Sequence, residues 1–154
     1  MSGTIDRPGG VTVIAIVNSF AAVLTLLFWG FVFLRMFAVA EPPRAMDTGS
    51  MATIFGFMVG DLIWAELVLI VSVIGLWRLR AWGWLAAQMV NILWLYSLTV
   101  IWCRDIYAGS FSPGGILFLP FVPFSVWACR YLWIIRERFW RPNSTKKIEG
   151  TQHG

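Results

Sequence analysis

Four long apolar runs, separated by short polar segments, dominate the chain. They cover about residues 11–37, 52–77, 82–102 and 116–135. Even the shortest run has roughly the 20 residues that an α-helix needs to cross a hydrocarbon core of ~30 Å. The proline, glycine and charged residues between the runs are typical of turns. The pattern predicts an all-α integral membrane protein whose four transmembrane helices form an up-down bundle.

The membrane domain is expected to fill residues 1–140, and residues 141–154 are expected to form a basic and then polar tail that is disordered. The first apolar run ends at Ala38-Val39-Ala40, which resembles a signal-peptidase site. The run is much longer than the roughly 7–15 apolar residues of a signal peptide, so we expect it to stay as a span. Cleavage after Ala40 remains the alternative, because a three-span protein would keep the same charge asymmetry between its loops.

Two prolines interrupt the fourth run. Pro120 falls near its start, where a missing N–H group costs little. Pro123 lies further inside, removes an interior hydrogen bond and is expected to kink the helix.

Gly56 and Gly60 stand four residues apart in the second run. This small-xxx-small spacing permits the close approach of a neighbouring helix. Glycine is also common in membrane helices in general, so the sequence leaves both interpretations open.

The composition agrees with a multi-pass protein of the cell membrane. Of the 154 residues, 58% are hydrophobic and 13% are charged, whereas soluble domains carry about 25% charged residues. The ten tryptophans are typical of side chains that anchor at the membrane interface. Trp64, Trp94 and Trp127 fall near mid-depth instead, where they either line a cavity for a hydrophobic ligand or serve as packing bulk.

The basic residues divide unevenly between the two sides of the membrane. With four spans, eight of them share the side of both termini, and three lie on the other side, namely Arg35, Arg44 and Arg104. The positive-inside rule therefore places both termini in the cytoplasm. Because the charges cluster at span ends, we do not expect nucleic acid as a partner.

Five of these residues follow the fourth run and are expected to meet anionic lipid headgroups at the cytoplasmic face: Arg136, Arg138, Arg141, Lys146 and Lys147. The alternative interpretation is that this basic cluster only fixes the topology.

A set of charged and amide side chains falls inside the predicted spans: Asp61, Glu66, Gln88, Asn91 and Arg130, with Asn18 in the first span. Charged groups there cost roughly 2.5–3.5 kcal/mol each on insertion scales, so each needs a partner or a water-filled cavity. Counted at ~1.5 Å per residue, Gln88 and Arg130 lie about 10 Å deep, and Glu66 and Asn91 about 15 Å. We therefore expect one polar layer in which Arg130 pairs with Glu66 and the two amides add hydrogen bonds.

Asp61 lies nearer the outer surface than Glu66. In an α-helix, five residues correspond to about 140° of rotation, so the two carboxylates are expected on different faces and not as an acid–base pair. Two interpretations of the polar residues remain. They form either a buried structural pair that fixes helix register, or a substrate site or proton relay with Asp61 at its outer mouth.

No cofactor or metal site is expected. The one histidine, His153, lies in the tail, and Cys103 and Cys129 lie at different depths without a CxxC motif. No nucleophile–base pair is visible either, so we do not expect an enzyme.

The leading functional expectation is a non-catalytic membrane protein that serves as an accessory or assembly subunit of a larger membrane complex. Its partners would be other membrane subunits or further copies of itself, because the apolar, aromatic and small-residue faces can pack against other helices. The alternative is a small oligomeric transporter or channel that uses the intramembrane carboxylates Glu66 and Asp61.

Overall fold

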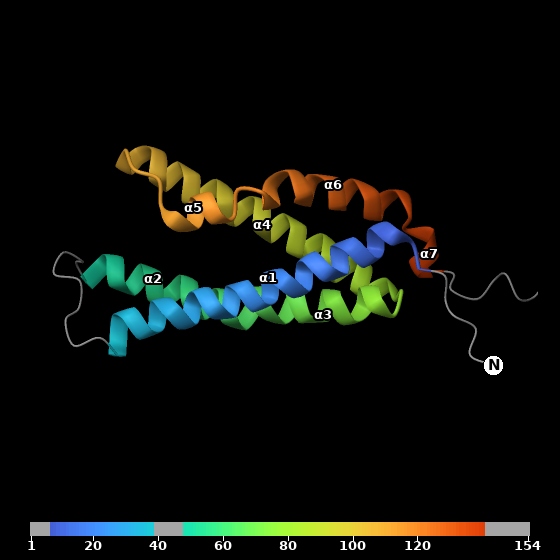
Figure 1. Cartoon of the computed structure of the whole chain (residues 1–154), viewed down its shortest axis with the longest axis horizontal. Helices are drawn as coiled ribbons and strands as arrows, with labels where there is room; N and C mark the ends of the chain where they lie inside the picture. The colour runs from blue at the N-terminus through green and yellow to red at the C-terminus, as the bar shows by residue number, and fades with distance from the viewer. Residues whose placement is uncertain (1–6, 39–47, 141–154) are drawn as a thin grey trace, which may run out of the picture.

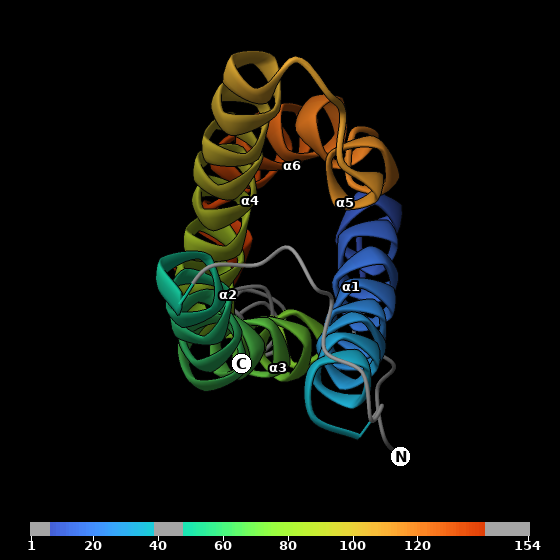
Figure 2. The ribbon, with the colours of Figure 1, turned by 90° about the vertical axis from the view of Figure 1, so that its left-hand side faces the viewer.

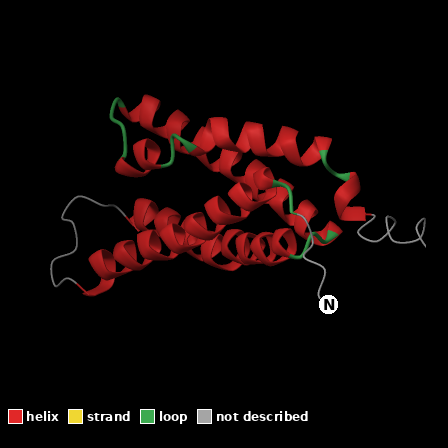
Figure 3. Cartoon of the chain, turned by 45° about the vertical axis from the view of Figure 1, so that its right-hand side comes forward, coloured by secondary structure: helices red, strands yellow, loops and turns green. Residues whose placement is uncertain are grey.

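The computed structural model describes residues 7–38 and 48–140, and every regular element in these two ranges is a helix (Figure 3). The position after Ala40, most of the first loop and the tail beyond residue 140 lie outside the described residues. The expectation of an all-helical chain is confirmed for the part that the structure describes.

The elements of the described chain are α-helices and two π-helical segments (η). In a π-helical segment, each N–H group bonds to the carbonyl five residues earlier. In chain order the elements are α1 (Gly9–Phe33), η1 (Leu34–Ala38), α2 (Thr48–Gly60), η2 (Asp61–Ala65), α3 (Glu66–Trp77), α4 (Ala81–Ala108), α5 (Pro113–Leu117), α6 (Phe121–Ile134) and α7 (Glu137–Trp140).

The long helices lie along one axis and alternate in direction (Figure 1). Viewed along that axis, α1 and α4 stand on opposite sides, with α3 and α6 between them (Figure 2). The α3–α4 and α1–α3 interfaces are the most extensive, followed by the α4–α6 interface. Residues far apart in sequence therefore face a common interior.

Three predicted spans are confirmed as helices that are long and apolar enough to cross a membrane: Gly9–Met36, Gly49–Trp77 and Ala81–Ala108. The second begins earlier than predicted because α2 already starts at Thr48. The number of crossings and the side of each terminus remain predictions.

The fourth apolar run is not one continuous helix. It is divided into α5 and α6, and Pro120 and Pro123 fall at the N-cap and in the first turn of α6, where N–H groups have no intrahelical partner anyway. The kink expected at Pro123 is therefore wrong. If the helix continued, the Pro123 ring would clash with the carbonyl of Leu119, and the chain breaks there instead, with Phe121 N donating to Phe118 O at 3.0 Å.

Helix α4 continues past its predicted end at Trp102 to Ala108. No helix-breaking residue occurs before Gly109, whose φ of 65° gives the left-handed C-cap that ends many helices. About 20 residues from Ala81 already cross a hydrocarbon core of ~30 Å. We therefore expect the end of α4, with Arg104 and Asp105, to project beyond the hydrocarbon.

The tightest packing lies between α3 and α4 at the turn that joins them. Gly75 and Gly83 approach so closely that a Cβ atom on either would collide with the backbone of the other. This contact stands beside the larger of two apolar core clusters, which includes Val11, Ile14 and Leu132.

Candidate functional site

The polar residues predicted to form one layer have different environments in the structure. Asp61 borders an internal cavity, Glu66 and Asn91 are buried, Gln88 is half-buried, and Arg130 is exposed. The candidate site must therefore be built around Asp61.

The predicted pairing of Arg130 with Glu66 is not formed. The ion pair that the described residues contain joins Arg104 to Asp105. On α6 the buried positions include Ala128 and Leu132. Arg130 lies two residues from each of them, about 200° around the helix, and so points outward.

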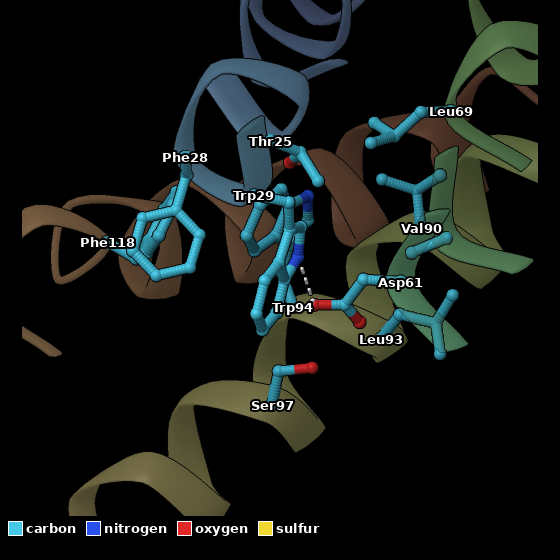
Figure 4. Close-up of a pocket in the computed structure, with 11 residues that line it drawn as sticks. Thr25, Phe28, Trp29, Asp61, Leu69, Val90, Leu93, Trp94, Ser97 and Phe118 are labelled. Carbon is cyan, nitrogen blue, oxygen red and sulfur yellow. Dashed lines mark hydrogen bonds between the residues drawn. The ribbon is translucent and has the colours of Figure 1, made fainter. Parts of the chain in front are cut away.

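A cavity of about 70 Å³ lies inside the bundle between α1, η2, α4 and the turn before α6 (Figure 4). Its walls combine four aromatic side chains with three polar ones: Phe28, Trp29, Trp94 and Phe118 with Thr25, Asp61 and Ser97. Drug-sized ligands occupy roughly 300–1,000 Å³, and a water molecule takes about 30 Å³. The cavity therefore suits water or a small polar ligand.

One hydrogen bond orients the carboxylate in this cavity. Trp29 Nε1 donates to Asp61 Oδ2 at 3.0 Å, the contact that is dashed in Figure 4. Trp29 is buried, and its ring meets Phe28 edge-on with centroids 5.1 Å apart. Helix α1 thus supplies a fixed donor to the acid of η2.

A packed aromatic cluster forms another part of the wall, where Phe118 meets Phe28 edge-on. The ring centroid of Trp94 lies 5.3 Å from that of Phe118 and 4.8 Å from that of Phe121. The three tryptophans predicted near mid-depth therefore differ in environment. Trp94 lines the cavity, whereas Trp64 and Trp127 are exposed on the outer surface.

The backbone of η2 changes the relation between the two intramembrane carboxylates. Glu66 N–H donates to Asp61 O, a bond that spans five residues. Such a turn is wider than an α-helical turn and brings residues five apart nearer to one face. The expected rotation of about 140° assumed a regular α-helix, and the π-turn changes that assumption. Glu66 lines neither of the two spaces that Asp61 borders, and the separation of the two carboxylates stays a prediction.

Asp61 also borders a second space. A groove of about 320 Å³ runs over the outside of α2 and is lined by Thr53, Gly56, Phe57, Gly60 and Asp61. A Cβ atom at either glycine would meet nothing within 4 Å, so the small-xxx-small spacing is not used for packing inside this bundle. The Asp61 carboxylate therefore lies between the internal cavity and an open outer groove.

In the part of the chain that the structure describes, four side chains have buried polar atoms without a hydrogen bond: Arg7 (Nε), Glu66 (Oε2), Asn91 (both amide atoms) and Ser125 (Oγ). The Asn91 amide interacts with the Cys129 thiol, but no bond of ordinary hydrogen-bond geometry satisfies it. Buried polar groups are normally paired, with water where protein partners are missing. The interior of the bundle thus contains polar atoms that the described protein contacts leave without a hydrogen bond.

The predicted basic cluster is described only in part. Arg136 and Arg138 are exposed beside α7, and the Arg136 guanidinium lies 5.1 Å from the Trp133 ring centroid. Arg141, Lys146 and Lys147 lie outside the described residues.

Sequence reasoning considered Trp94 as a cavity residue but missed the other aromatic partners of Asp61, namely Phe28, Trp29 and Phe118. On α1 a buried stripe at helical spacing runs through Asn18, Ala22, Thr25 and Trp29, and this pattern of small and polar residues could have identified the face. Phe118 gave no comparable signal, because its position depends on the break before Pro120.

In residues 7–38 and 48–140, no group of three or more His, Cys, Asp and Glu side chains could hold a metal ion. The arrangement around Asp61 offers instead one carboxylate among aromatic faces, a combination that attracts small organic cations. Comparison with protein-family models, curated proteins and solved structures finds no match for this chain, so a function has to be argued from this geometry.

Proposed function

We propose that the chain is a small membrane transporter that takes a small cation of the ammonium class into the cavity at Asp61. The observation that carries the proposal is the position of this carboxylate, which lines both the internal cavity and the open groove on α2. A group that borders both spaces can receive a ligand from one and pass it to the other.

The chemistry of the cavity supports a cation over an anion or an apolar solute. A carboxylate at membrane depth is costly unless a partner or water reaches it. The indole of Trp29 donates one hydrogen bond, and aromatic faces attract cations by roughly 0.5–2 kcal/mol each. The volume of about 70 Å³ restricts the ligand to the size of ammonium or methylammonium.

Interruptions of helices in the bundle also support transport. The second span contains the π-turn Asp61–Ala65, and the fourth apolar run is broken before Pro120. Transporters often build their substrate and ion sites where membrane helices are discontinuous, and π-turns occur frequently at functional sites.

The test is uptake of radiolabelled methylammonium into liposomes that contain the full-length protein. We expect saturable uptake above that of empty liposomes, reduced at least about tenfold in Asp61→Asn and in Trp94→Leu. Trp64→Leu is the matched control, because Trp64 is 71% exposed and does not line the cavity. Uptake equal to that of empty liposomes, or unchanged in Asp61→Asn, would refute the proposal.

An accessory or assembly subunit is the second candidate, and the open groove on α2 favours it. Gly56 and Gly60 face empty space there, and such small-residue faces accept neighbouring membrane helices. This candidate predicts a larger assembly with other proteins after mild extraction, and a Glu66→Gln variant that weakens the assembly without affecting any transport. A lone homo-oligomer by native mass would count against it.

A further inference from the structure

A second surface, on the outside of the bundle and lined by none of the residues that line the Asp61 cavity, carries an independent inference. A groove of about 650 Å³ runs between α4 and α6. Its apolar wall includes Leu85, Ile92 and Ile134, which are 55%, 62% and 69% exposed. This volume is large enough for part of an extended acyl chain.

Arg130 lies in the same groove. Its side chain is exposed, and within the described ranges it forms neither an ion pair nor a hydrogen bond. A guanidinium at this predicted depth, facing lipid, is costly unless it extends to the interface and meets an anion. The expected partner Glu66 is buried in the interior and cannot serve.

The groove continues toward the end of the bundle where α6 meets α7. An adjoining space is lined by Trp84, Trp133, Arg136, Glu137 and Trp140, and it shares both Trp84 and Trp133 with the first groove. The Arg136 guanidinium is held over Trp133 at 5.1 Å. Glu137 is the one acid in this lining, and it forms no ion pair with Arg136 in the described structure.

We propose that the α4–α6 groove binds an anionic phospholipid. One acyl chain would lie against Leu85, Ile92 and Ile134, while Arg130 on α6 and Arg136 in the turn after α6 hold the phosphate. Arginine suits this role because its planar guanidinium recognises phosphate oxygens bidentately. The tryptophans at the groove head would sit at headgroup level, as aromatic residues do at membrane interfaces. This site does not depend on the proposed transport function.

The experiment is native mass spectrometry of the full-length protein in detergent, titrated with phosphatidylglycerol or phosphatidylcholine of identical acyl chains. We expect one tight phosphatidylglycerol, bound at least roughly fivefold more strongly than phosphatidylcholine, as one basic contact near the surface provides. Arg130→Gln should lower this preference roughly fivefold, and Arg130→Lys, which keeps the charge but not the bidentate geometry, should lower it by less.

Arg78→Gln is the matched control, since Arg78 is an exposed arginine at the same end of the bundle and does not line the groove. It should keep the preference of the unaltered protein. Equal binding of the two lipids, or an unchanged preference in Arg130→Gln, would mean that only ordinary annular lipid covers this groove and would overturn the proposal.

Discussion

At the scale of single residues, Asp105 shows how one carboxylate fixes the turn after α4, which we expect to lie outside the hydrocarbon. Its Oδ2 accepts from Ser112 N and Ser112 Oγ, both at 2.7 Å, and its Oδ1 pairs with Arg104 at 2.8 Å. These bonds, above all the one from the Ser112 backbone, lower the pKa of Asp105 to about 2. Nothing in the pattern of the predicted loop indicated this role.

The low pKa of Asp105 predicts the pH dependence of this turn. Because the pKa in the folded protein lies below the ordinary value of 3.8, the stabilisation is complete above about pH 3.8 and is lost as the pH falls toward about 2. Amide hydrogen exchange across residues 109–112, corrected for intrinsic rates, should rise within that window. In Asp105→Asn it should be fast already at neutral pH, and a persisting acid step there would contradict the assignment.

The contact between Gly75 and Gly83 supports a prediction about stability. Gly83→Ala places a methyl group against the α3 backbone and should destabilise the protein by about 1–3 kcal/mol, the usual cost of overpacking. Gly30→Ala is the control, because a Cβ atom there meets nothing within 4 Å and alanine favours helix. Thermal unfolding in detergent compares the two, and equal stability would show that the close approach is not required.

At the scale of elements, the π-turn Asp61–Ala65 determines which way Asp61 points. Deleting Ile63, which is 48% exposed, should let the segment close as a regular α-helix. Asp61 would then rotate away from Trp29, and methylammonium uptake should fall roughly tenfold with helix content unchanged by circular dichroism.

The substitution Ile63→Ala keeps the chain length and serves as the control for the deletion. It removes the same side chain without changing the register between Asp61 and Glu66, so uptake should remain. Full uptake by the deletion variant would show that the π-turn is not needed to orient the carboxylate.

Elements also show what the sequence could and could not predict. Three long helices follow directly from apolar runs without helix-breaking residues. To predict the break before α6, one would have to know that the Pro123 ring would clash with the carbonyl of Leu119. The π-turn η2 could not be predicted, because the segment Asp61–Ala65 contains no proline or glycine that would indicate an irregular helix. The cavity depends on both irregularities. Its acid and Trp94 were candidates from the sequence, but Phe28, Trp29 and Phe118 were not.

At the scale of the whole molecule, the open question is whether the divided fourth run crosses the membrane. We expect both termini in the cytoplasm, as the distribution of basic residues predicts. In a protein without its native cysteines, Ser110→Cys should react with an impermeant maleimide added to intact cells, because Ser110 is exposed at the far end of α4.

A cysteine placed after residue 154 should react only once the membrane is permeabilised, which also verifies that the site is reactive. Labelling of both cysteines from outside would mean that α5 and α6 do not cross, and that the protein has three spans.

The short length of α6 has a consequence for where the protein resides. Its 14 residues extend about 21 Å at 1.5 Å per residue, against a hydrocarbon thickness of ~30 Å. Lipid beside α6 would have to compress, while lipid beside α1 would not, so the protein should deform its two flanks unequally. Mismatch of this kind costs fractions of a kcal/mol per Å and sorts proteins among membranes of different thickness. By shortening α6, Pro120 and Pro123 would thereby enrich the protein in regions where the bilayer is thinner or more strongly curved.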